Sequence, residues 1–106
     1  MTEKEAEEIV GNLVVHGGIA RSSCLEAIKC ARHGKFDQAD ELMSEAQTEL
    51  NQAHNYQTAQ ITKEMSGEGS DNTPLLMVHG QDHLMCAMVV YDLANQMIGI
   101  LKDSSK

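Results

Sequence analysis

Apolar residues recur at spacings of three and four along most of the chain, a pattern that predicts long amphipathic helices. Thr2 and Glu5 form a capping box at the start of the first helix, and Gly34 can end it in a left-handed conformation. The predicted helices cover residues 3–33, 36–66 and 74–103. The chain is therefore expected to be all-α, with residues 1–106 in one domain and residues 67–72 as the only linker-like stretch.

Two features interrupt the regular apolar faces. Gly17 and Gly18 each weaken the first helix by about 1 kcal/mol relative to alanine, which predicts a kink or a close approach of another helix at this point. The inward face of the second helix becomes polar toward its end, at Gln57 and Gln60. A purely structural bundle would leave this polar end unexplained.

The third helix is apolar around its whole circumference from Leu84 to Tyr91. A surface helix of a monomeric bundle needs a single apolar stripe, so a helix without a polar side needs a second buried surface. A methionine-rich, loosely specified core is the alternative interpretation. Because two partner helices cannot cover every side of a third, we predict that this helix forms an oligomer interface.

The composition restricts the classes of partner. The net charge of −8, from 16 acidic against 8 basic residues, argues against nucleic acid or an anionic membrane and favours a protein with a basic face. Three cysteines, an odd number, fall within apolar helical patterns and indicate reduced, packed side chains in a cytosolic protein: Cys24, Cys30 and Cys86. Neither a signal peptide nor a hydrophobic segment of membrane-spanning length is expected, so the protein should be soluble and intracellular.

The strongest candidate for a functional site lies near the start of the third helix, where two histidines and an aspartate fall within five residues. At ~100° per residue, Asp82 lies ~60° to one side of His79 and His83 lies ~40° to the other, so all three share one face. Gln81 lies nearly opposite. A histidine can carry protons, bind a metal or accept a phosphoryl group, and its neighbours decide which.

The charges around this cluster constrain its chemistry. No Lys or Arg occurs between Lys63 and Lys102. A phosphoryl group on His79 would therefore be stabilised by the helix N-terminus, by neutral donors, or by another helix or subunit. Asp82 is flanked by apolar residues on the predicted interface helix, where its carboxylate would be costly to bury without a partner or a metal ion.

Three segments of the chain resemble the motifs of the lactose/cellobiose-type enzyme IIA of the bacterial phosphoenolpyruvate-dependent sugar phosphotransferase system. Residues 78–85, VHGQDHLM, are similar to the H-[AG]-Q-D-H-L-M signature of that family. Residues 15–22, VHGGIARS, resemble its first-helix motif, and residues 53–58, AHNYQT, resemble its second-helix motif A-H-x-x-Q-T. The resemblance covers nearly the whole chain, and three motifs in order are far more specific than a lone HxxDH.

This resemblance implies an antiparallel three-helix bundle that assembles into a homotrimer, with the third helices packed around the threefold axis. It implies that His79 accepts a phosphoryl group on Nε2 from phospho-HPr and passes it to a cysteine of enzyme IIB. Gln81 and His83 match the motif positions close to the phosphorylation site. Asp82 and its two symmetry mates would bind one divalent cation, which we expect to be Mg²⁺.

The resemblance also has implications for the transported sugar and for the cellular location of the protein. The first-helix motif is closer to the cellobiose/chitobiose branch than to the lactose branch of the family. An enzyme IIA acts in the cytoplasm without membrane insertion and never touches the sugar, so its sequence holds no direct record of the substrate. Uptake of a β-disaccharide is the expectation, with cellobiose or chitobiose favoured.

Two other classes of function stay open. In a metal-binding module, His79 and His83 would supply two imidazoles one turn apart. This module lacks a third ligand other than Asp82, because Cys86 is expected to be buried. The other class is a purely structural helical oligomer.

The remaining candidate residues have simpler interpretations. His16 and His54 are expected to be structural or to face a partner, because no titratable or nucleophilic residue is spaced to assist them. Arg21 could reach a phosphate from the first helix, and a solvated arginine is the alternative.

Overall fold

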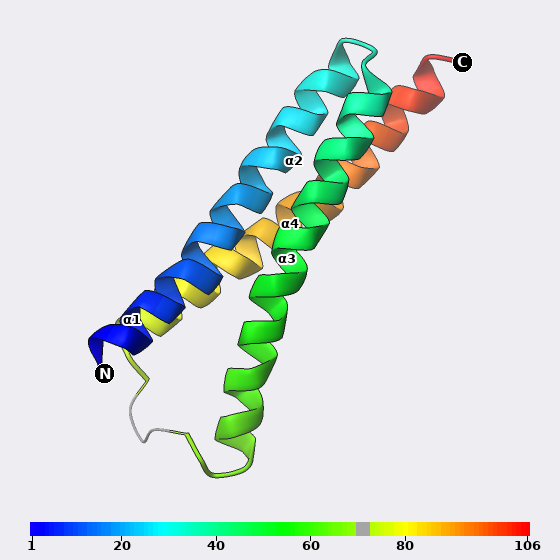
Figure 1. Cartoon of the computed structure of the whole chain (residues 1–106). Coiled ribbons are helices and arrows are strands. Elements are labelled where there is room, and N and C mark those ends of the chain that lie inside the picture. The colour runs from blue at the N-terminus through cyan, green and yellow to red at the C-terminus, as the bar shows by residue number, and fades with distance from the viewer. Residues whose placement is uncertain (70–72) are drawn as a thin grey trace.

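The computed structural model describes residues 1–69 and 73–106, and every regular element among them is helical. The helices are α1 (Glu3–Ile9), the π-helical segment η1 (Val10–Val15), α2 (His16–Arg32), α3 (Phe36–Met65) and α4 (Leu75–Ser104). The first three are consecutive and form one rod, so the chain builds three long rods, as the apolar pattern predicts (Figure 1). The predicted linker at 67–72 is described only in part, because residues 70–72 lie outside the described residues.

The three rods form an elongated bundle of 55 × 24 × 18 Å (Figure 1). The chain runs up through α1, η1 and α2, returns through α3, and runs up again through α4, which lies behind the other two in this view. The all-α class and the alternating direction of the helices agree with the predicted bundle.

Local sequence signals set the helix ends. Thr2 and Glu5 make both hydrogen bonds of the predicted capping box. Gly34 takes a φ of +76° after α2, a backbone conformation that glycine adopts without a steric penalty. Pro74 has an extended backbone and immediately precedes Leu75, the first residue of α4; its missing N–H costs nothing there, because the first N–H groups of a helix have no partner within it.

The first rod approaches α4 closely at two glycines. A Cβ on Gly17 would lie 3.6 Å from the backbone of His83, so the close approach predicted near Gly17 and Gly18 is confirmed for Gly17. A Cβ on Gly80 would lie 3.0 Å from the side chain of Leu13, which belongs to the π-helical segment. Both contacts lie next to the His-Asp-His cluster, so α4 is held tightly against the first rod there.

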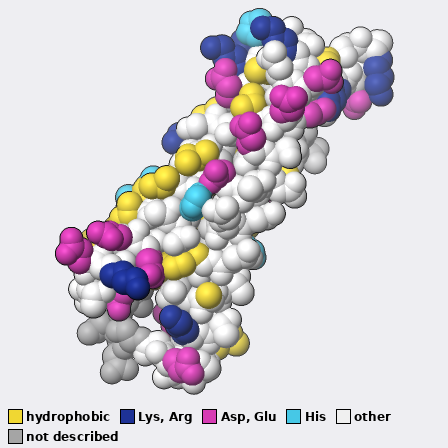
Figure 2. Space-filling model, viewed as in Figure 1, with side chains coloured by type: hydrophobic (Ala, Val, Ile, Leu, Met, Phe, Trp, Pro, Cys, Tyr) yellow, Lys and Arg dark blue, Asp and Glu magenta, His cyan; other side chains and the backbone are white. Residues whose placement is uncertain are grey.

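The core consists mainly of small side chains, which allow the helices to pack at short distance. Fully buried alanines lie on all three rods: Ala20, Ala27, Ala39, Ala46, Ala53, Ala87 and Ala94. Larger core residues fill the spaces between them: Ile9, Leu13, Met43, Leu50, Leu84 and Ile98. In this view the charged side chains gather toward the two ends of the molecule (Figure 2).

The third predicted helix, α4, has two apolar faces, one buried and one exposed. One face of α4 packs in the bundle through residues such as Leu84, Ala87 and Ile98. The other face is exposed and remains apolar; we call it the free α4 face: Val78, Met85, Val89, Leu93, Met97 and Ile100. These residues recur at spacings of three, four or seven, so they lie in one row along the helix.

α4 is long enough and apolar enough to cross a membrane by length and composition. The prediction that no segment has membrane-spanning length is therefore wrong on these two criteria. α4 contains many apolar residues because two of its faces are apolar. The core helix of a soluble protein can be equally long and apolar. His79, Asp82 and Asp92 interrupt the helix with ionisable groups, which are costly inside a bilayer.

The three cysteines are reduced, but they occupy different environments. Cys24 is buried in the core, where burial raises the pKa of its thiol to about 11, and Cys30 is half-buried. Cys86 is exposed. The prediction that all three pack is therefore wrong for Cys86, because around the helix Cys86 lies on the exposed side of α4, between Leu93 and Met97.

Candidate functional site

The two histidines of the cluster contact each other on the surface of α4. His79 and His83 lie one turn apart, and their Nε2 atoms are 3.1 Å from each other. The ring centroids are 4.6 Å apart and the ring planes are nearly perpendicular, at 80°. One Nε2 must carry a hydrogen and donate it to the lone pair of the other. The predicted common face of the two residues is confirmed.

The histidine pair opens into a groove between α2 and α4. From α4 the groove is lined by His79, Asp82, His83 and Cys86. From the first rod it is lined by small and apolar residues and by one cation: Val14, Val15, Gly17, Gly18, Ile19, Arg21, Ser22 and Ser23. Arg21 is exposed and brings a guanidinium to a groove whose α4 wall has no Lys or Arg. The exposure of Arg21 agrees with the interpretation that its side chain is solvated. Arg21 nevertheless lines the same groove as His79.

Asp82 is exposed and lies in the row of the free α4 face, between Val78 and Met85. It also lines the groove beside His79. Among residues 1–69 and 73–106, no three His, Cys, Asp or Glu side chains lie close enough together to hold a metal ion. A metal bound through Asp82 would therefore need ligands from outside this single chain or from water.

Gln81 points away from the histidine pair, as the helical geometry predicts. Its side-chain oxygen accepts a hydrogen bond from Nε2 of Gln57, which is buried on α3. The same Gln57 Nε2 lies 3.7 Å from the sulfur of Met85. This contact accounts for Gln57 in the polar end of the second helix, because its side-chain amide is paired with Gln81 between α3 and α4.

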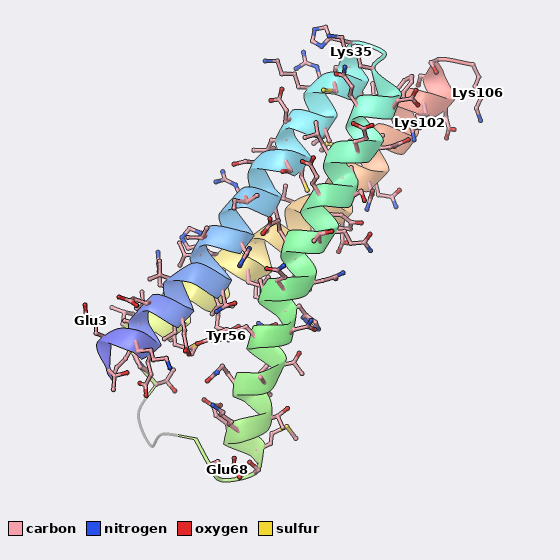
Figure 3. The ribbon with its side chains drawn as sticks, in the orientation of Figure 1. Glu3, Lys35, Tyr56, Glu68, Lys102 and Lys106 are labelled. Carbon is pink, nitrogen blue, oxygen red and sulfur yellow. The ribbon has the colours of Figure 1, made fainter. Side chains whose placement is uncertain are left out.

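A second hollow lies where α1, α3 and α4 diverge. Tyr56 projects from α3 into the space beside α1 (Figure 3). Burial raises the pKa of the Tyr56 hydroxyl, and the negative charges of Glu8 and Glu5 raise it further. This hollow shares Asp82 with the groove, but it contains neither histidine of the pair.

The structure adds a contact between the first rod and α3 that no sequence pattern predicted. His16 contacts Glu49 through Nδ1, joining the first rod to α3, and both side chains are partly buried. The two residues are 33 positions apart, so no helical spacing connects them. In the sequence, the sign that His16 contacts another helix was its position in the inward apolar row of the first helix. His54 is exposed on α3.

Comparison with known proteins identifies a family for this chain. Residues 8–102 match the family described as "PTS system, Lactose/Cellobiose specific IIA subunit". The lichenan-specific phosphotransferase enzyme IIA component of Bacillus subtilis (strain 168) is 46% identical over 95 residues, which make up 90% of this chain and 86% of that protein.

Two solved structures share the fold. The cellobiose-specific enzyme IIA of Bacillus anthracis superimposes with a TM-score of 0.88 at 40% identity, covering 99% of this chain and 94% of that one. The chitobiose IIA of the Escherichia coli phosphotransferase system, solved in complex with HPr, superimposes with a TM-score of 0.77 at 34% identity, covering 95% and 97%. The match over residues 8–102, together with relatives at this level of identity, shows that the chain belongs to the lactose/cellobiose-specific IIA subunit family of the phosphotransferase system.

Proposed function

We propose that the protein is a phosphocarrier that accepts a phosphoryl group from phospho-HPr on Nε2 of His79 and passes it to a cysteine of enzyme IIB. The observation that carries the proposal is the position of the His79 ring, exposed in the α2–α4 groove with its Nε2 in contact with Nε2 of His83. Membership of the family supports a general role for this protein in phosphoryl transfer.

The transfer to His79 uses the lone pair of its Nε2. That lone pair attacks phosphorus, the bond between phosphorus and the donor atom of HPr breaks, and the donor atom keeps the electron pair. The contact between the two Nε2 atoms must open before the attack, because both groups need the same space. The Nε2–H of His83 is then free to donate to an oxygen of the new phosphoryl group, which assigns His83 a positioning role. Gln81 belongs to the α3 contact and supports α4 from the other side.

The electrostatic setting suits a carrier rather than a tight phosphate binder. Among the described residues that line the groove, Arg21 is the only Lys or Arg, whereas Asp82 adds a negative charge. Both His79 and Asp82 are exposed, so solvent screens these charges. A phosphoryl group held by several arginines would be slow to leave, and a single exposed arginine leaves it transferable.

A defined reconstitution tests the proposal against the two alternatives, a metal-binding module and a purely structural oligomer. The protein is incubated with phosphoenolpyruvate, enzyme I and HPr, and the label is examined for stability in acid and base. We expect an acid-labile, base-stable phosphoryl group that appears only when HPr is present. Absence of label with active enzyme I and HPr would refute the phosphocarrier function.

We expect association with HPr to weaken with added salt. The net charge of −8 and the cation-poor groove favour a partner with a basic docking face, and such attraction is screened over ~10 Å at 0.1 M ionic strength. The solved complex of the related chitobiose IIA with HPr supports HPr as the partner. Titration calorimetry across a tenfold range of ionic strength should show a several-fold rise in Kd, mostly through a slower association rate. A Kd independent of salt would contradict this electrostatic docking.

We further propose that the protein is a homotrimer whose free α4 faces meet at the threefold axis. The exposed apolar row of α4 supports this, because a row of half-exposed residues such as Met85, Val89 and Leu93 is unfavourable in water. Asp82 lies in that row, so threefold symmetry would bring three carboxylates together. Three carboxylate oxygens completed by water would suit Mg²⁺, which prefers octahedral oxygen ligands.

Replacement of Asp82 by leucine tests this axial site. We expect Asp82→Leu to remain trimeric, to keep its phosphoryl acceptance on His79, and to be neutral or more stable by about 1–4 kcal/mol, since it removes three repelling charges. Thermal unfolding should respond to EDTA and Mg²⁺ in the wild type only. A monomeric Asp82→Leu protein, or a wild-type melting temperature that ignores both EDTA and Mg²⁺, would count against an axial metal.

The cargo and location complete the proposal. The relatives are named for lichenan, cellobiose, chitobiose and lactose, and these names support uptake of a β-disaccharide. Our proposal favours cellobiose or chitobiose over lactose because of the first-helix motif at residues 15–22. The sugar itself would be bound by other components, and this protein would act in the cytoplasm between HPr and enzyme IIB, without nucleic acid or membrane insertion. A transport assay with the matching membrane components would identify the disaccharide.

A further inference from the structure

We propose that the His79–His83 pair is also a binding site for a transition-metal cation of the Zn²⁺ type, and that the bound cation excludes the phosphoryl group. The second half of this proposal rests on the proposed phosphoryl acceptance by His79, whereas the first half does not. The site differs from the axial position of Asp82 in its ligand atoms, which are ring nitrogens instead of carboxylate oxygens.

The distance between the two ring nitrogens suits a shared metal ion. The Nε2 atoms of His79 and His83 are 3.1 Å apart. Two Zn–N bonds of about 2.0–2.1 Å at a near-tetrahedral angle place their nitrogens about 3.3 Å apart. A small rotation of the perpendicular rings is therefore enough to direct both lone pairs at one ion. Because the residues are one turn apart on a continuous helix, the backbone need not move.

Coordination requires a change of tautomer without a change of charge. In the observed contact one of the two Nε2 atoms carries a hydrogen. Moving that proton to Nδ1 of the same ring, through water, leaves both Nε2 lone pairs free for the metal. Both residues line the open groove, so solvent reaches the rings and exchange can occur.

The rest of the coordination shell is open. No third ligand among the described residues lies close enough to complete a preformed site, so water would fill the remaining positions. Cys86 is exposed, follows His83 by three residues and lines the same groove, which makes its thiolate the nearest soft ligand. Imidazole and thiolate favour Zn²⁺ and Cu²⁺ over Mg²⁺, so this pair would remain selective in the presence of magnesium.

Occupation by metal and phosphorylation are mutually exclusive at His79. A neutral imidazole has a single lone pair on Nε2, and that lone pair forms either the N–P bond or the N–metal bond. A Zn²⁺ ion on the pair would therefore stop His79 from accepting a phosphoryl group, and a phosphorylated His79 would lose the metal. The carrier would respond to free zinc without any change of fold.

Titration calorimetry with Zn²⁺ on the unphosphorylated protein, in excess Mg²⁺, tests the metal site without HPr. We expect one Zn²⁺ per chain, with affinity reduced at least tenfold by His83→Gln and by His79→Gln. The matched control is His54→Gln, an exposed histidine on α3, which should bind as the wild type does. Circular dichroism checks that each variant keeps its helices. Wild-type affinity in both His79→Gln and His83→Gln, or no Zn²⁺ binding in the wild type, would overturn the proposal.

Transfer from purified phospho-HPr tests the exclusion. Zn²⁺ at a concentration that saturates the site should slow labelling of the wild type at least tenfold, EDTA should restore it, and pre-phosphorylated protein should not bind Zn²⁺. Unchanged labelling in saturating Zn²⁺ would overturn the exclusion. Failure of labelling in the absence of Zn²⁺ would instead refute the proposed phosphocarrier function, so the two failures are distinguishable.

Discussion

Replacement of His79 by alanine is expected to abolish phosphoryl acceptance from phospho-HPr while the protein keeps its fold. His79 is exposed, and its ring contacts His83 in the α2–α4 groove, so its loss leaves no cavity in the bundle. The position near the start of α4 places the new phosphoryl group where the helix dipole favours an anion. Label should be undetectable in His79→Ala after a reaction that fully labels the wild type, and the circular dichroism spectrum should be unchanged.

Two matched histidine variants make the assignment specific. His54→Ala removes an exposed histidine on α3 and should be labelled like the wild type. His83→Ala should accept the phosphoryl group more slowly, because the incoming phosphoryl group loses the hydrogen bond proposed from Nε2–H of His83, but it should still reach full labelling. Labelling of His79→Ala at the wild-type level, or complete loss of label in His83→Ala alone, would refute His79 as the acceptor.

A glutamate in the middle of the free α4 face is expected to dissociate the proposed trimer. Val89 is 57% exposed in the single chain and lies at the centre of the exposed row. Three glutamates brought together at a threefold axis would repel one another in a poorly solvated interface. We expect Val89→Glu to weaken assembly by about 3 kcal/mol or more, which corresponds to about a hundredfold in the dissociation constant. Sedimentation equilibrium should find a helical monomer at concentrations where the wild type is trimeric.

The control for this variant adds the same charge to another side of α4. Asn95 is exposed but lies about 120° from Val89 around the helix, outside the apolar row. Asn95→Glu should therefore remain trimeric. A trimeric Val89→Glu protein would contradict the placement of α4 at the axis, and a wild type that is monomeric at micromolar concentration would contradict the trimer itself.

Much of the fold and part of the candidate site depend on local patterns, and these could be predicted. The helical spacing of apolar residues predicts the three rods, and the capping box at Thr2 and the glycine at Gly34 predict two of their ends. The common face of His79 and His83 follows from the same periodicity, because both residues lie on one helix. The three motifs at residues 15–22, 53–58 and 78–85 were sufficient to indicate the family.

The surroundings of the site depend on contacts between helices, which no local spacing records. Only the tertiary structure pairs His16 with Glu49 and Gln57 with Gln81, and only the packing of α2 brings Arg21 into the groove of His79. The same packing decides which part of the apolar α4 helix is buried, and this explains why the prediction for Cys86 was wrong.

The sequence by itself determined the helices, the shared face of the histidine pair and the family, because each depends on residues close together in the chain or on a continuous motif. The tertiary structure decided the neighbours of that pair and the free face of α4. The reason is physical: a helix presents every side chain at a fixed angle, whereas its crossing partners are selected by where small residues such as Gly17 and Gly80 allow close approach.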